Sequence, residues 1–256
     1  MNSMIHRDSK FSIAFEQTKD KLFHHSNAFM YLFILHLIGY LFAFNSGISG
    51  FGSGDFLQFS YRSFSTTPLY VMTIFWMIFQ GSSLAEEKNR QYYMVSNNFT
   101  AYFSDIAVLE IFALIGGVLT LFSGFFMQVY GTLFMENFVL HSVYGSMGVL
   151  HYLTLFITGT LYFLIFGTAA YFVGILRVRY KSRFILVAFV AAILLIVAGL
   201  LAVRVFGDSA LFNIESLFRF YLDERSFFIW LIKVLLTIAG LYTVSYFGIK
   251  NMEVNR

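Results

Sequence analysis

The chain has 256 residues, of which 58% are hydrophobic and only 12% charged, with a net charge of +3 and a mean hydropathy of +0.72. A soluble domain carries about twice that fraction of charged residues, and the lack of cysteine excludes disulfides, thiol catalysis and cysteine-ligated metals. Three runs without Asp, Glu, Lys or Arg, at 22–54, 63–85 and 137–176, are each long enough to cross a bilayer, which takes about 20 apolar residues. The composition therefore predicts an all-α integral membrane protein.

The first 27 residues are polar and mixed in charge, without the basic start and short apolar core of a signal peptide. Within them, residues 8–23 repeat apolar or small side chains at helical spacing and carry charged side chains on the opposite face. This pattern predicts an amphipathic helix on the cytoplasmic surface of the membrane. The apolar face is formed by Phe11, Ala14, Phe15, Thr18 and Leu22, and the charged face by Glu16, Lys19 and Asp20.

The rest of the chain is organised as a six-helix membrane domain, residues 28–249, followed by a short tail, residues 250–256. Basic residues are enriched in cytoplasmic loops and so indicate orientation. With six spans, twelve of the seventeen Lys and Arg residues fall on the side of the termini, four on the other side, and Lys233 within the last span. Both termini are therefore predicted to be cytoplasmic. The expected spans are 28–46, 65–85, 106–129, 143–174, 184–205 and 227–249.

Three connecting regions have distinct patterns. The glycine-rich residues 47–55 are expected to form a flexible external loop. Residues 209–222 carry apolar side chains on one helical face, which predicts an interfacial or re-entrant helix before the last span. The uncharged run 137–176 would be roughly 60 Å long as one helix, so either its start lies along the outer surface or it contains a break.

Ionisable side chains inside a bilayer are costly and mark candidate functional positions. Three of those within the expected spans are candidates for a substrate path, although His36 also suits a polar core position and the other two also suit snorkelling to the nearer interface. His141 and His151 are about 80° from sharing one helical face, which does not favour a metal pair, and no metal is expected. The three path candidates are His36, Glu110 and Lys233.

A stretch with two adjacent carboxylates, LAEEKNRQYYMVSNNF, residues 84–99, follows the second span. Its EExxR spacing is one residue short of the EExxxR of membrane-embedded CAAX-type proteases, which moves Arg90 by about 100° around a helix relative to the two glutamates. No lysine follows a glycine anywhere in the chain, so no GxxxxGK[ST] phosphate-binding loop is present. The stretch is therefore better suited to receiving a soluble partner than to catalysis.

This stretch resembles the first cytoplasmic loop of ABC-2 type ABC transporter permeases, in which an acidic residue ends span two and a short coupling helix follows. Glu86 or Glu87 matches the acidic position, Lys88 the basic neighbour and residues 93–96 the apolar element that ends in serine. Gln91 and Asn97-Asn98 stand where the family has glycine and proline. The elbow-like first helix, the six spans and the charged inner loop extend the resemblance over the whole chain.

The resemblance implies a permease subunit of an exporter in a bacterial plasma membrane, without an ATPase site of its own and binding no cofactor. ATP and Mg²⁺ would be bound by a partner ABC ATPase dimer, and a second permease subunit, identical or related, would complete the path. The partner would contact the first loop, because charged and aromatic side chains suit such docking. The implied contact residues are Glu86, Glu87, Lys88, Arg90, Tyr92 and Tyr93.

The second inner loop, RVRYKSR, is a further candidate contact or, alternatively, an anchor to lipid headgroups. Its basic residues are Arg177, Arg179, Lys181 and Arg183. The few charges and many aromatic residues of the spans suit an amphipathic peptide as cargo, and the chain is similar to Gram-positive permeases that export phenol-soluble modulins. No nucleic-acid partner is expected. Two alternatives remain open, namely a membrane immunity or sensory protein and an intramembrane CAAX-type protease.

Overall fold

The structure is a computed structural model and describes residues 10–45, 48–54, 57–63, 65–87, 98–134, 149–180 and 226–250. Helices account for most of these residues, and two strands form a hairpin outside the helical bundle. The elements in chain order are α1 (Lys10–His24), α2 (Asn27–Asn45), β1 (Ile48–Gly54), β2 (Leu57–Ser63), α3 (Thr67–Glu87), α4 (Asn98–Phe134), α5 (Val149–Tyr180) and α8 (Phe227–Lys250).

Five of the described helices, α2, α3, α4, α5 and α8, are long and apolar enough to cross a membrane. They correspond to five of the six predicted spans, and the chain therefore has the features of a membrane protein. The remaining predicted span, 184–205, and the predicted helix 209–222 lie outside the described residues. Helix α4 begins eight residues before the predicted start at position 106, and α5 is continuous from Val149 to Tyr180.

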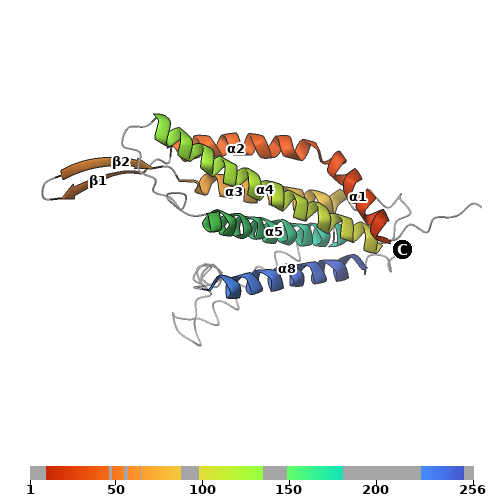
Figure 1. Cartoon of the computed structure of the whole chain (residues 1–256). Coiled ribbons are helices and arrows are strands. Elements are labelled where there is room, and N and C mark those ends of the chain that lie inside the picture. Colours follow the sequence, from red (N-terminus) through yellow and green to blue (C-terminus); the bar gives the residue numbers. More distant parts are fainter. Residues whose placement is uncertain are drawn as a thin grey trace, which may run out of the picture.

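The helices are arranged around α3, α4 and α5, with α2 packed on α3 and α8 packed on α5 (Figure 1). The most extensive contact between described helices joins α3 and α5. A β-carbon added to Gly81 of α3 would lie 2.1 Å from the carbonyl oxygen of Gly167 in α5. Small residues allow such close backbone approach, which gains van der Waals contact where the hydrophobic effect does not drive helix association. This glycine contact sets the separation of the two central helices.

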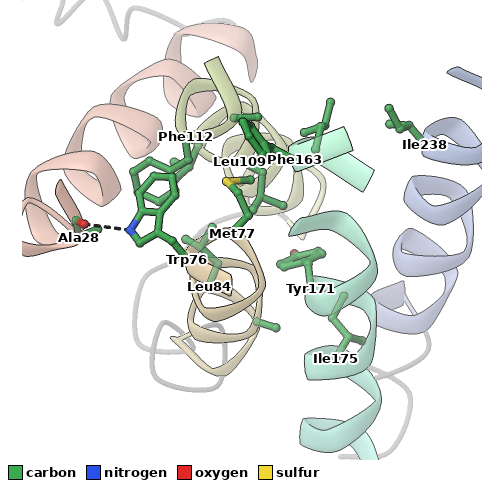
Figure 2. Close-up of a cluster of buried hydrophobic side chains, with 14 of the residues drawn as sticks. Ala28, Trp76, Met77, Leu84, Leu109, Phe112, Phe163, Tyr171, Ile175 and Ile238 are labelled. Carbon is green, nitrogen blue, oxygen red and sulfur yellow. Dashed lines mark hydrogen bonds between the residues drawn. The ribbon is translucent and has the colours of Figure 1, made fainter. Parts of the chain in front are cut away.

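The buried core runs through all five long helices (Figure 2). The indole of Trp76 packs against Phe112, with ring centroids 5.3 Å apart, and donates a hydrogen bond of 2.9 Å to the carbonyl oxygen of Ala28. This single side chain therefore joins α2, α3 and α4. The largest fully buried side chains include Trp76, Tyr171, Phe112, Phe163, Leu32, Leu69, Met77 and Leu84.

Helix α1 forms where the sequence predicts a helix, and it packs on α4 through small side chains and one lysine. Ala14, Thr18 and Lys21 face α4, whereas Phe11 and Phe15 are 68% and 74% exposed. The exposure of these two aromatic side chains is compatible with the predicted membrane-facing side, and the small side chains allow close contact with α4. Lys21 accompanies them because it lies three and seven positions after Thr18 and Ala14, on the same side of the helix.

Residues 48–54 and 57–63 form the two antiparallel strands of a hairpin, where the sequence analysis predicts a flexible loop over 47–55. The pairing runs from Ile48 opposite Ser63 to Gly54 opposite Leu57. The second strand, LQFSYRS, alternates apolar with polar residues at the period of a β-strand. The first strand is rich in glycine and lacks this alternation, so the sequence does not predict that the two segments pair. The hairpin projects beyond one end of the helical bundle (Figure 1).

Candidate functional site

The end of the bundle opposite the hairpin, here called the α1 end, brings together charged side chains from four helices (Figure 1). The last turn of α1, the last turn of α3, the first two turns of α4 and the last three turns of α5 all contribute. Residues 88–97, the loop that follows α3 and precedes α4, begin and end there but lie outside the described residues. The α1 end therefore contains the residues that directly precede and follow the first predicted partner-binding loop.

Lys21 and Asp105 form a buried ion pair between α1 and α4, with side chains 6% and 3% exposed. The Lys21 ammonium also donates to the Ser104 hydroxyl at 2.6 Å and to the Ala101 carbonyl oxygen at 3.1 Å. Three acceptors thus match the three protons of the ammonium. Such complete pairing is what makes a buried charge tolerable in a low-dielectric environment.

The carboxylate of Asp105 links this pair to α5. Its second oxygen accepts a hydrogen bond of 2.7 Å from the hydroxyl of Tyr171, which is fully buried. Nearby on α4, the hydroxyl of Tyr102 donates to the backbone carbonyl oxygen of Tyr242 in α8. The first turns of α4 are therefore bound to α1, α5 and α8 through polar side chains.

The two adjacent glutamates at the end of α3 contact different helices. The carboxylate of Glu87 accepts a hydrogen bond of 2.6 Å from His25 Nε2 and lies 3.7 Å from His24 Nε2. Glu86 accepts a bond of 2.8 Å from the Arg177 guanidinium of α5, at an exposed position. The two carboxylates consequently hold the end of α3 between α1 and α5.

The remaining predicted loop residues divide into described and undescribed positions. Arg179 lies over the ring of Tyr180, with its guanidinium carbon 5.5 Å from the ring centroid. The structure thus pairs Arg177 with Glu86 of another helix, whereas Arg179 contacts the neighbouring ring on its own helix. Lys88, Arg90, Tyr92 and Tyr93 of the first loop, and Lys181 and Arg183 of the second, lie outside the described residues.

His36 belongs to a second polar cluster, midway along the bundle. The Thr73 hydroxyl donates to the Leu69 carbonyl oxygen at 2.9 Å, so it accepts from His36 Nε2 at 3.0 Å and from Thr120 at 2.9 Å. The other ring nitrogen, Nδ1, then accepts from the Ser123 hydroxyl at 3.0 Å. These bonds select a neutral imidazole with its proton on Nε2 and bind α2 to α3 and α4.

The other two path candidates lie apart from His36. Glu110 is exposed on α4. It is the thirteenth residue of that helix, whereas the predicted span start at 106 places it about one turn from the beginning of the span. Lys233 is half-buried on α8, and its backbone carbonyl accepts a bond of 2.9 Å from Thr237. The described structure therefore does not gather the three candidates into one site.

The sequence analysis missed Lys21, Asp105, Tyr171 and the two histidines, which make most of the contacts at the α1 end. Asp105 falls one residue before the predicted span at 106–129. A carboxylate is common at such a boundary, so its position gives no indication that it is buried. Lys21 shares a helical face with Ala14 and Thr18, which is the one local signal for its burial.

No protein family model, no curated protein and no solved structure matches this chain. Within the described ranges, no group of three or more His, Asp or Glu side chains is placed to hold a metal ion. The functional argument therefore depends on the geometry of the α1 end.

Proposed function

We propose that this chain is the permease subunit of an ABC-2 type exporter. The observation that supports this function best is the double attachment of loop 88–97. Before the loop, Glu87 is bound to His25, and after it, Asp105 is bound to Lys21, so the residues on both sides of the loop are held by the last turn of α1 and the residue that follows it. A force applied to this loop would move four helices together. A permease driven by a separate ATPase requires such a transmission.

Within this proposal, the loop residues have two roles. Glu86 and Glu87 anchor the loop to the bundle through Arg177 and His25. Lys88, Arg90, Tyr92 and Tyr93 then supply the charges and rigid aromatic surface that a soluble partner binds. The partner is an ABC ATPase dimer that carries ATP and Mg²⁺, and this chain itself binds no cofactor.

The proposal places the chain in a bacterial plasma membrane with both termini and the α1 end in the cytoplasm, as the distribution of Lys and Arg indicates. The remaining basic residues of the second loop, Arg179, Lys181 and Arg183, would contact lipid headgroups. A second permease subunit completes a path for an amphipathic peptide. The aromatic and aliphatic surface of the long helices suits such cargo and the surrounding lipid, and His36, Glu110 and Lys233 remain the candidates for polar contacts along the path.

The test is purification of the tagged chain from membranes of its native host in a mild detergent, followed by identification of bound proteins. We expect a protein that contains GxxxxGK[ST] to co-purify and to hydrolyse ATP faster with the chain than alone. In Tyr93→Ala this stimulation should fall, whereas Lys19→Ala, on the exposed face of α1, should retain it.

Other results would contradict the proposal. Full stimulation in Tyr93→Ala would remove the partner-binding role of the loop. Binding of a peptide without ATP-dependent flux in proteoliposomes would instead indicate an immunity or sensory protein. Peptide cleavage that is lost in Glu86→Ala and needs no ATPase would indicate a protease.

A further inference from the structure

Helix α4 presents an acidic side chain on its surface. Glu110 is exposed and lies within Phe99–Phe134, the part of α4 that is apolar enough to cross a membrane. Within the described ranges it forms no ion pair and no hydrogen bond, whereas Asp105, five residues earlier, is paired with Lys21. An ionisable group in the hydrocarbon region of a bilayer is costly unless it meets a counter-charge or a polar environment. Glu110 therefore marks a position where a positively charged group would be stabilised.

The same side of α4 continues from Glu110 as an apolar strip. At about 100° per residue, Leu114 and Val118 lie about 40° and 80° around the helix from Glu110, and they are 47% and 42% exposed. Further along, Leu121 and Phe125 lie about 20° and 60° from it. These five residues, Glu110, Leu114, Val118, Leu121 and Phe125, are here called the α4 strip. The strip thus carries one acid at its first position and apolar side chains at all the others.

A hollow lies at the far end of the α4 strip, between α4 and α5. It has a volume of about 340 Å³ and is lined by Leu121, Phe122 and Phe125 of α4 and by Tyr152 of α5. Aliphatic and aromatic side chains form this lining, so the hollow suits an apolar group. At 1.5 Å per residue, its α4 residues are about 17 to 23 Å from Glu110 along the helix axis. The strip therefore joins a position for a cation to a position for an apolar group.

This pairing of charge and hollow fits an amphipathic peptide better than the other possible occupants. In a helical peptide, a separation of about 17 to 23 Å corresponds to about 11 to 15 residues. A lipid acyl chain would fill the hollow but would leave Glu110 without a counter-charge. A second copy of this chain, packed on the strip about a two-fold axis along the helix, would bring two Glu110 carboxylates together, and like charges repel.

We propose that the α4 strip is a binding surface for a cationic amphipathic helical peptide. A lysine or arginine side chain of the peptide pairs with Glu110, and a large apolar side chain about 11 to 15 residues away enters the hollow. The basic end of the bound peptide then points toward the α1 end of the bundle. As a statement about cargo, this inference rests on the proposed function, because it names the class of peptide that the permease would carry. The binding itself requires no ATPase.

Binding can be measured on the full chain in lipid nanodiscs, without any ATPase, by fluorescence anisotropy of a dye-labelled synthetic peptide. The lysine probe is a helical peptide of alanine and leucine, about 20 residues long, with one lysine and one phenylalanine twelve positions apart. The glutamine probe is identical except that glutamine replaces the lysine, and binding to empty nanodiscs is subtracted for both. The lysine probe should bind about tenfold more tightly, because it forms a charge-assisted hydrogen bond with Glu110.

Three substitutions separate the contributions of the acid and of the hollow. Glu110→Gln should abolish the preference for the lysine probe and leave the affinity for the glutamine probe unchanged. Leu121→Trp, which fills the hollow, should weaken the binding of both probes about tenfold, because an apolar side chain of the peptide then stays in contact with water or lipid. Glu16→Gln is the matched control, because it removes an exposed acid of α1 and should change neither affinity.

Two kinds of result would overturn the proposal. The first is an equal affinity of both probes for the unsubstituted chain, or an undiminished preference for the lysine probe in Glu110→Gln, and either would indicate that the strip only faces lipid. The comparison of the two probes does not depend on the folding of any variant. The second concerns Val118→Cys, which introduces a single thiol because the native chain has no cysteine. Disulfide-linked dimers of Val118→Cys that form without peptide would show that a second copy covers the strip.

The outcome is separable from the proposed function. Selective binding of the lysine probe by a chain to which no ATPase binds would support the α4 strip and contradict the permease role. Stimulation of a bound ATPase, together with equal affinities for the two probes, would overturn the α4 strip and leave the permease role standing.

Discussion

Lys21 and Asp105 lie 84 positions apart in the sequence and form a buried ion pair in the folded chain. The pair joins a helix that precedes the first long apolar helix to the beginning of α4. A buried ion pair gains little over a well-packed apolar contact, but the loss of one partner leaves an uncompensated charge. The pair therefore specifies where α1 packs more than it adds to the stability of the whole chain.

Asp105→Asn should lower the free energy of unfolding by about 3–5 kcal/mol, because it leaves the Lys21 ammonium buried without its counter-ion. The measurement is unfolding of the purified chain in mixed detergent micelles. The control is Glu86→Gln, which breaks an exposed pair with Arg177 and should cost less than about 1 kcal/mol. Equal losses in the two variants would show that the Lys21–Asp105 pair is not buried as described.

Gly81→Ala should destabilise the chain by about 1–3 kcal/mol or prevent its accumulation, because the new methyl group would meet the Gly167 carbonyl at 2.1 Å. The matched control is Gly240→Ala in α8, whose added methyl group meets nothing within 4 Å among the described residues. That control should be neutral or stabilising by up to about 1 kcal/mol. Thermal stability in detergent reports both variants, and a Gly81→Ala chain as stable as the control would refute close packing of α3 on α5.

His36→Leu should cost about 1–3 kcal/mol, because the Thr73 and Ser123 hydroxyls lose a buried partner. His36→Gln should cost less, since its amide keeps one donor and one acceptor. The same unfolding measurement compares them. If both variants unfold like the unsubstituted chain but lose transport, His36 contacts cargo instead of fastening α2 to its neighbours.

Trp76→Phe should lower stability by about 1–3 kcal/mol through the smaller ring and the lost bond to the Ala28 carbonyl oxygen. The chain has only two tryptophans, so Trp230→Phe leaves Trp76 as the sole indole fluorophore. Its emission should be blue-shifted in the folded chain and move to longer wavelength on unfolding, since Trp76 is 1% exposed. A long-wavelength emission in the folded state would contradict this burial.

Local patterns were enough to predict the membrane class, five of the described helices and the helix at 10–24. Each of these depends on runs or periods of apolar residues within about 20 positions. Local patterns also identified Glu86 and Glu87 as two adjacent carboxylates directly after an apolar run. The partners of these carboxylates, Arg177 and His25, are separated from them by 91 and 62 positions and could not be inferred locally.

The same limit explains why the packing of α1 and the pairing of the two strands could not be inferred. Phe11 and Phe15 indicate an amphipathic helix, but which of its residues pack on α4 depends on tertiary contact, and close contact favours small side chains such as Ala14. The glycine-rich residues 48–54 lack the alternating pattern of a β-strand, so the sequence did not predict one there. They form a strand only because they pair with residues 57–63.

The sequence by itself determined that this chain has helices long and apolar enough to cross a membrane, and roughly where they lie, because backbone hydrogen bonds within an apolar helix are satisfied without any other part of the chain. Only the tertiary structure decided that Lys21 pairs with Asp105 and His25 with Glu87 at one end of the bundle. Charged groups in a region of low dielectric must find partners, and which partners they find depends on how the helices cross.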